Sequence, residues 1–183
     1  MSERTPLLVL GLGNVLLQDD GVGAAAVALL AERYTAPEGA LVLDGGTLGL
    51  SLLPYLESAD ALILVDAIRA DAQPGSLVRV TGEDVVPAVA TRLSPHQVGV
   101  ADLLDGARWL NRYPGRVVLV GLVPESMELA VGLSANVWPA LPALVERVVH
   151  EAGAWGFAFH RKSADETPAP DRTLDVARLA GMR

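Results

Sequence analysis

Four short, almost entirely apolar segments predict the strands of a sheet that is buried on both faces. They do not alternate apolar with polar residues, as a strand with one wet face would, and each is bounded by glycine, aspartate or proline. The segments are Leu7–Leu12, Leu41–Leu43, Ala61–Val65 and Val117–Val123. Because strands buried on both faces are typical of parallel sheets, we expect a parallel sheet covered by helices.

Between these segments, apolar residues recur every three or four positions, which is the spacing of an amphipathic helix. The clearest example runs from Val22 to about Arg33. The other predicted helices are Leu48–Leu56, which contains Pro54, then Val98–Leu110 and the later part of Ala135–Glu151. Strands and helices alternate along the chain, and this order predicts a layered α/β fold with right-handed crossovers.

The remaining segments add one strand and a tail. Leu77–Val80 follows a turn at residues 73–75 and is interpreted as an extra strand. From residue 160 onward the chain is polar and contains prolines, as flexible tails do. We therefore expect one α/β domain over residues 1–159 and a flexible tail over 160–183.

Composition and charge narrow the partners that this chain can have. The 183 residues are 51% hydrophobic, contain no cysteine and carry a formal net charge of −8. An acidic surface is repelled by nucleic-acid phosphates and by anionic lipid, so we expect neither nucleic acid nor membrane as a partner. The lack of cysteine excludes disulfides, thiolate ligands and a cysteine nucleophile from this chain. The apolar runs are too short to span a membrane and no signal-peptide cleavage region is present, so we expect a cytoplasmic protein. The sequence leaves the oligomeric state open, and a monomer is the default expectation.

Acidic residues recur where the predicted strands end. Asp19 and Asp20 follow the first strand, Asp44 the second and Asp66 the third, while His96 lies in the loop before a later helix. Ligands of parallel α/β sheets bind at the carboxyl ends of the strands. These side chains are therefore the candidate functional residues.

Each acidic residue also has a structural interpretation. Asp19 or Asp20 could cap the helix that begins near Gly21, although both cannot cap the same turn. Asp44 precedes two glycines and is a good turn residue. Asp66 closes the most apolar strand, where a carboxylate needs a partner or a cation to offset its desolvation.

His96 is the histidine best suited to a site. His150 falls late in a predicted helix, where a structural role suffices, and His160 begins the predicted tail. Asp20, Asp66 and His96 together offer two oxygen ligands and one nitrogen ligand. Such a set suits a borderline divalent cation and leaves coordination positions open. We therefore hypothesise a metal site at these three residues.

Motifs of other enzyme classes do not occur. The sequence has no Gly-x-Ser-x-Gly elbow, no His-Glu-x-x-His motif and no phosphate-binding Walker loop. Gly11 and Gly13 begin a dinucleotide fingerprint, and Asp44 sits where a ribose-binding acid would, but Leu16 occupies the position of the third glycine. Nucleotide binding by an α/β protein is therefore a less favoured alternative.

Five sequence blocks resemble the nickel–iron hydrogenase maturation endopeptidases, and they occur in the order that this family shows. The blocks are Leu10–Asn14 continued by Asp19–Gly23, then Asp44–Thr47, Leu64–Ala67, Ser94–Gln97 and Val120–Ser126. The resemblance extends from about Leu7 to about Glu151 and is absent from the tail.

The resemblance implies a three-layer α/β fold, with a twisted, mainly parallel sheet and helices on both faces. It implies an endopeptidase that removes the C-terminal extension of a hydrogenase large-subunit precursor after nickel insertion. The family's metal-binding acid, acid and histidine match Asp20, Asp66 and His96, which become the expected catalytic and metal-binding residues. The first of these is often glutamate or aspartate in the family, so Asp20 is an acceptable variant with a shorter reach than glutamate. Asp44 becomes a further candidate, as a catalytic or substrate-contacting residue.

Two mechanisms are consistent with this resemblance. In one, Asp20, Asp66 and His96 hold a metal that polarises the scissile carbonyl or activates water. In the other, which we favour, they complete the coordination of nickel already held by substrate cysteines. Nickel would then act as a recognition element, and no organic cofactor is expected. A non-catalytic nickel-binding chaperone is the alternative function.

Overall fold

The computed structural model describes residues 4–46, 48–90 and 98–163, and its centre is a five-stranded sheet. The strands, in the order in which they lie, are β3 (Ala40–Gly46), β1 (Thr5–Leu12), β4 (Ala59–Ala67), β6 (Arg116–Leu122) and β5 (Leu77–Thr81). The first four run parallel, whereas β5 pairs antiparallel with β6 at one edge. The mainly parallel sheet and its extra strand are confirmed.

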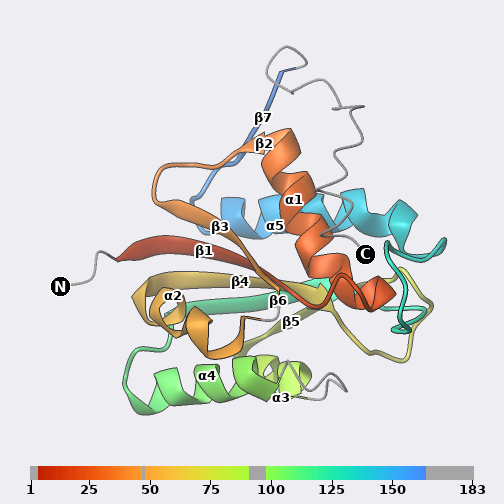
Figure 1. The fold of residues 1–183 in the computed structure, drawn as a ribbon. Coiled ribbons are helices and arrows are strands. Elements are labelled where there is room, and N and C mark those ends of the chain that lie inside the picture. The colour runs from red at the N-terminus through yellow and green to blue at the C-terminus, as the bar shows by residue number, and fades with distance from the viewer. Residues whose placement is uncertain (1–3, 47, 91–97, 164–183) are drawn as a thin grey trace.

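Helices cover both faces of the sheet, which gives the fold three layers (Figure 1). On one face lie α1 (Val22–Arg33) and α5 (Leu141–Ala154), and on the other lie α2 (Leu53–Ser58), α3 (Val85–Ala90) and α4 (Val98–Trp109). The described segments also form short 3-10 helices, which are η1 (Gln18–Gly21), η2 (Gly49–Leu52), η3 (Gly82–Asp84) and η4 (Trp138–Ala140). None of the described helices is long and apolar enough to cross a membrane.

The sheet separates two hydrophobic cores. Successive side chains of a strand point to opposite faces, and β1 shows the consequence. Leu7 and Val9 pack in the core under α1 and α5, while Leu8 and Leu10 pack in the core under α2, α3 and α4. All four side chains are fully buried. Both faces of the central strands are therefore dry, which explains why their sequences do not alternate apolar with polar residues.

The helices on the α2 side differ from the sequence prediction. The segment predicted as one helix at Leu48–Leu56 forms η2 followed by α2. Pro54 lies in the first turn of α2, where its missing N–H removes no intrahelical hydrogen bond. The helix α3 is not predicted by the sequence pattern, because six residues are too few to show a helical period.

The described residues continue past the predicted boundary between domain and tail at residue 159. His160–Arg161 forms β7, which pairs antiparallel with β2 (Tyr34–Thr35) at the end of α1. The backbone N–H of Lys162 donates to the carbonyl of Arg33 at 2.9 Å, and its Nζ donates to the carbonyl of Ala31 at 2.7 Å. The first residues of the predicted tail are thus bound to the domain. The rest of the tail, from residue 164, lies outside the described residues.

An ion pair fastens the edge strand β5 to the helix α5. The guanidinium of Arg79 donates from Nε to Oε1 of Glu151 at 2.7 Å and from Nη2 to Oε2 at 3.0 Å. Glu151 is buried, and the hydrogen bonds from Arg79 hold the pKa of its carboxyl below the usual range. The pair therefore offsets the cost of burying a carboxylate beneath the edge of the sheet.

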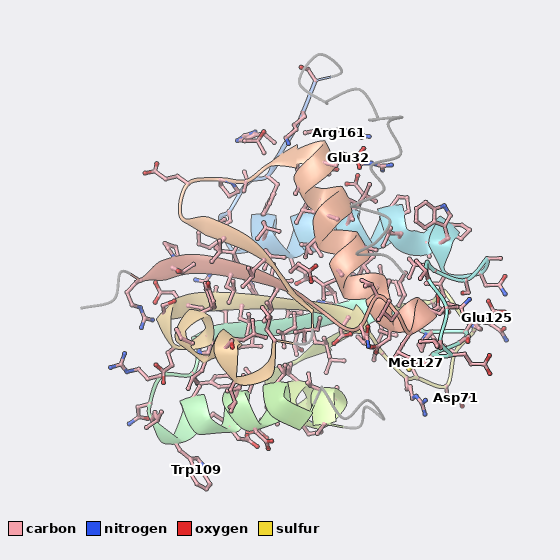
Figure 2. The ribbon with its side chains drawn as sticks, viewed as in Figure 1. Glu32, Asp71, Trp109, Glu125, Met127 and Arg161 are labelled. Carbon is pink, nitrogen blue, oxygen red and sulfur yellow. The ribbon has the colours of Figure 1, made fainter. Side chains whose placement is uncertain are left out.

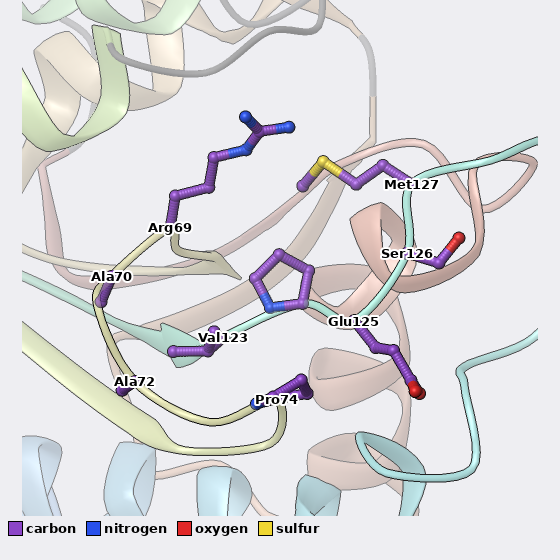
Figure 3. Close-up of a pocket in the computed structure, with 9 residues that line it drawn as sticks. Arg69, Ala70, Ala72, Pro74, Val123, Glu125, Ser126 and Met127 are labelled. Carbon is purple, nitrogen blue, oxygen red and sulfur yellow. The ribbon is translucent and has the colours of Figure 1, made fainter.

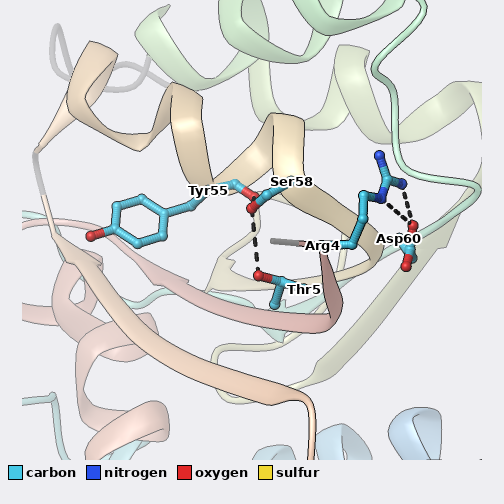
Figure 4. Close-up of polar contacts among 5 residues, drawn as sticks. All are labelled: Arg4, Thr5, Tyr55, Ser58 and Asp60. Carbon is cyan, nitrogen blue, oxygen red and sulfur yellow. Dashed lines mark hydrogen bonds and ion pairs between the residues drawn. The ribbon is translucent and has the colours of Figure 1, made fainter. Parts of the chain in front are cut away.

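Polar contacts also close the amino-terminal edge of the sheet (Figure 4). The Nε of Arg4, just before β1, donates to Oδ1 of Asp60 in β4 at 2.8 Å. Next to this pair, the hydroxyl oxygens of Thr5 and Ser58 lie 3.5 Å apart. The partners are 56 and 53 positions apart in sequence, so the contacts join the start of β1 to the end of α2 and the start of β4.

Candidate active site

Asp20 lies at the carboxyl end of β1, in the short helix η1. Its side chain is buried, and its Oδ2 accepts a hydrogen bond from the backbone N–H of Asn14 at 2.7 Å. The chain can fold back this tightly because position 13 is glycine. Gly13 has a φ of 115°, and a Cβ there would lie 1.7 Å from the carbonyl oxygen of Asp20. This close approach accounts for Gly13 without a bound dinucleotide.

Asp66 is the penultimate residue of β4, a central strand of the sheet. It is fully buried, and its Oδ1 accepts a hydrogen bond from the backbone N–H of Ala67 at 2.8 Å. The helix η1, which carries Asp20, packs against β4. The structure therefore places two of the three predicted metal ligands, both buried carboxylates, on adjoining elements at one edge of the sheet.

Asp19 has a role that the sequence did not reveal. One of its oxygens, Oδ2, accepts hydrogen bonds from the backbone N–H groups of Glu125 and Ser126 at 2.9 and 3.0 Å. The other, Oδ1, accepts one from Ser134 at 2.7 Å. The predicted helix cap is wrong, because the N-cap of α1 is Gly21 and no side-chain hydrogen bond caps that described turn. Asp19 instead ties the loop after β1 to the loop after β6.

Asp44 lies in β3, two residues before the strand ends. Its Oδ1 accepts a hydrogen bond from the backbone N–H of Gly46 at 2.9 Å, and its side chain is exposed. Asp44 is paired with Gly11 of β1, so it lies at the same carboxyl edge as Asp20 and Asp66. The hydrogen bond to Gly46 gives Asp44 a local structural role, and a catalytic or substrate-contacting role for Asp44 stays a prediction.

His96 lies outside the described residues, just before α4. Within the described ranges, no three histidine, cysteine, aspartate or glutamate side chains form a group that could hold a metal. The metal site at Asp20, Asp66 and His96 therefore stays a prediction, because one of its three ligands lies in the segment that is not described.

A pocket of about 370 Å³ opens between the loops that follow β4 and β6 (Figure 3). Its lining residues are Arg69, Ala70, Ala72, Pro74 and the run from Val123 to Met127. Figure 2 shows Glu125 and Met127 at the carboxyl edge of the sheet, whereas Trp109 lies at the opposite corner of the molecule. Sequence patterns do not indicate this pocket, because loop residues with no shared period form it.

Comparison with known proteins shows to which family this chain belongs. The family model described as hydrogenase maturation protease matches residues 24–151, which contain strands β3, β4, β5 and β6 and the helices α2, α3 and α4. The chain belongs to the hydrogenase maturation protease family. The matched range contains Asp66 and the position of His96, and Asp20 lies just before it.

Individual relatives of this maturation protease agree with that assignment. The hydrogenase 2 maturation protease of Escherichia coli K12 is 38% identical over 144 residues, which are 78% of this chain and 88% of the relative. The hydrogenase expression/formation protein HupD of Rhodobacter capsulatus is 40% identical over 171 residues, covering 92% and 81% of the two chains.

Solved structures of family members have the same fold. The hydrogenase maturating endopeptidase HybD from Escherichia coli superposes with a TM-score of 0.82 at 35% identity, covering 86% of this chain and 98% of that one. The [NiFe] hydrogenase maturation protease HybD from Thermococcus kodakarensis gives a TM-score of 0.65 at 30% identity, covering 80% and 99%. The predicted fold class and the predicted enzyme class, a peptidase of hydrogenase maturation, are confirmed.

Proposed function

We propose that this maturation protease removes the C-terminal extension of a nickel–iron hydrogenase large-subunit precursor after nickel insertion. One observation of the structure supports the proposal in addition to family membership. The buried carboxylates of the described residues are Asp19, Asp20, Asp66 and Glu151, and the first three lie together at the carboxyl edge of the sheet. Burying a carboxylate costs free energy because the group loses its hydration. Clusters of buried carboxylates are therefore typical of binding and catalytic sites, where the function requires them.

Asp20, Asp66 and His96 are the proposed ligands of nickel that arrives with the substrate. Two carboxylates and an imidazole hold a borderline divalent cation weakly, and the chain has no cysteine with which to strengthen the site. Cysteines of the precursor supply the missing thiolate ligands in this proposal. The complete coordination then exists only when a nickel-loaded precursor is bound, so nickel serves as a recognition element.

The rigidity of the two acids supports this role. Asp66 is held in a central strand, and Asp20 is held by the tight turn at Gly13 and by its hydrogen bond from Asn14. Side chains fixed in this way lose little conformational freedom when a substrate binds. Asp44, exposed at the same edge, is the proposed contact to the substrate polypeptide.

Intact-mass spectrometry of a cognate precursor tests the proposal. The wild-type protein should remove a C-terminal peptide from nickel-loaded precursor and leave nickel-free precursor intact. His96→Ala should slow cleavage by more than the roughly 10–100-fold that loss of an outer-shell partner costs, because a direct ligand is removed. His150→Ala, a change at an exposed histidine of α5, is the matched control and should cleave normally.

The other outcomes separate the alternatives. Cleavage of both precursor forms at equal rates would contradict the recognition role of nickel while keeping the peptidase. An unchanged precursor mass in every reaction, with nickel bound to this protein, would favour a non-catalytic nickel chaperone instead.

A further inference from the structure

The pocket between the loops after β4 and β6 carries a guanidinium at its rim. Within the described part of the chain, the side chain of Arg69 makes no hydrogen bond or ion pair. The other charged residue of the lining, Glu125, accepts a hydrogen bond from Nδ2 of Asn136 at 2.8 Å. Figure 3 shows the carboxylate of Glu125 turned away from Arg69. The cation at the pocket is thus available to a ligand.

Apart from Arg69, Glu125 and Ser126, the side chains that line the pocket are apolar. Val123, Pro74 and two alanines form one side of the pocket, and the side chain of Met127 lies across from Arg69 (Figure 3). An aliphatic stem that ends in a carboxylate fits such a surface, because arginine binds carboxylates through two parallel hydrogen bonds. A volume of about 370 Å³ is at the small end of ligand pockets and admits a short piece of polypeptide.

The pocket lies close to Asp20 and Asp66, the two proposed nickel ligands among the described residues. Arg69 follows Asp66 by three positions, in the loop just after the same strand. The facing loop is held by Asp19, the neighbour of Asp20, through the N–H groups of Glu125 and Ser126. A polypeptide whose scissile bond reaches Asp66 therefore has its flanking residues within reach of this pocket.

We propose that this pocket is a substrate subsite in which Arg69 pairs with a carboxylate of the precursor near the cleaved bond. The inference rests on the proposed function and adds a specificity-determining residue to it. The carboxylate belongs to an acidic side chain of the precursor or to its C-terminus, and both present the same chemistry to Arg69.

Steady-state cleavage of nickel-loaded precursor tests the role of Arg69. Arg69→Gln should raise KM about tenfold with little change in kcat, because it removes a charge-assisted bidentate contact to bound substrate. Arg69→Glu should raise KM further. Arg112→Gln, a change at an exposed arginine in the loop between α4 and β6, is the matched control and should leave KM unchanged. An unchanged KM for Arg69→Glu overturns the inference while the proposed function stands.

Variants of the precursor identify the carboxylate. Each acidic side chain near the cleavage site is changed to its amide, and a separate precursor carries two extra C-terminal residues that displace the terminal carboxylate. One of these changes should raise KM for the wild type and have no further effect on Arg69→Gln. Lysine at the acidic side chain so identified should restore cleavage by Arg69→Glu. Strictly multiplicative effects for every pair of changes overturn the pairing.

A binding measurement separates failure of this inference from failure of the proposed function. A fluorescently labelled peptide with the sequence of the precursor's C-terminal segment should bind the wild type, by anisotropy, about tenfold more tightly than it binds Arg69→Gln. Equal affinity for both proteins overturns the subsite, whether or not the wild type cleaves precursor.

Discussion

Asp19 shows how a single residue organises the carboxyl edge of the sheet. Its carboxylate is fully buried and receives backbone N–H groups from residues 106, 107 and 115 positions away. Three hydrogen bonds to one ionised acceptor offset the cost of burying it. They also fix the loop that lines the pocket relative to the turn that holds Asp20. Position 19 is therefore a positioning residue rather than a helix cap.

Replacing this carboxylate should loosen both loops. Asp19→Asn puts an NH₂ donor toward backbone N–H groups, so the free energy of unfolding should fall by about 2–4 kcal/mol. Precursor cleavage should also slow, with the larger effect on KM. Denaturant unfolding measures the first effect, and Asp71→Asn, at an exposed aspartate in the loop after β4, is the control with a change below about 0.5 kcal/mol. Equal stability of Asp19→Asn and wild type would contradict this role.

The packing of α1 on the sheet is the element-scale feature that positions the site. A Cβ at Gly23, in the first turn of α1, would lie 2.3 Å from the carbonyl oxygens of both Leu12 and Val65. The helix therefore approaches the ends of β1 and β4 more closely than it could with any residue other than glycine at position 23. This approach brings η1, with Asp20, against the strand that carries Asp66.

An added methyl group at this point should displace the whole helix. Gly23→Ala should lower the free energy of unfolding by about 3 kcal/mol, since both obstructing atoms belong to the backbone and cannot turn aside. Gly106→Ala, in α4, meets open space and should stabilise the protein by about 0.5–1 kcal/mol through helix propensity. Thermal and denaturant unfolding measure both. Similar effects of the two changes would refute the close approach of α1.

The elements were predictable from the sequence where burial alone determines them. Strands β1, β4 and β6 are dry on both faces, and their apolar runs identify them directly. The paired strands β2 and β7 were not predictable, because each has two residues and depends on a partner more than a hundred positions away. The role of Asp19 was hidden for the same reason. Long-range contacts of single polar residues leave no periodic signal in a sequence.

The whole molecule has two chemically different edges. At the amino edge, Arg4 and Asp60 form an exposed pair, of a kind that contributes about 0–1 kcal/mol to stability. At the carboxyl edge, Asp20 and Asp66 are buried and belong to the proposed nickel site. The strand β4 carries an aspartate at each end, one exposed and one buried, so a single strand offers both a test of the site and its control.

We propose that residues at the carboxyl edge of the sheet carry out the cleavage of the hydrogenase precursor. The most direct test is the cleavage rate of nickel-loaded precursor, followed by intact mass, for the wild type, Asp66→Asn and Asp60→Asn. Circular dichroism melting should show that both variants are folded. We predict that Asp66→Asn loses cleavage by at least about 100-fold, because an amide replaces an anionic ligand, while Asp60→Asn cleaves at the wild-type rate. A folded Asp66→Asn variant that cleaves as fast as Asp60→Asn would contradict the account.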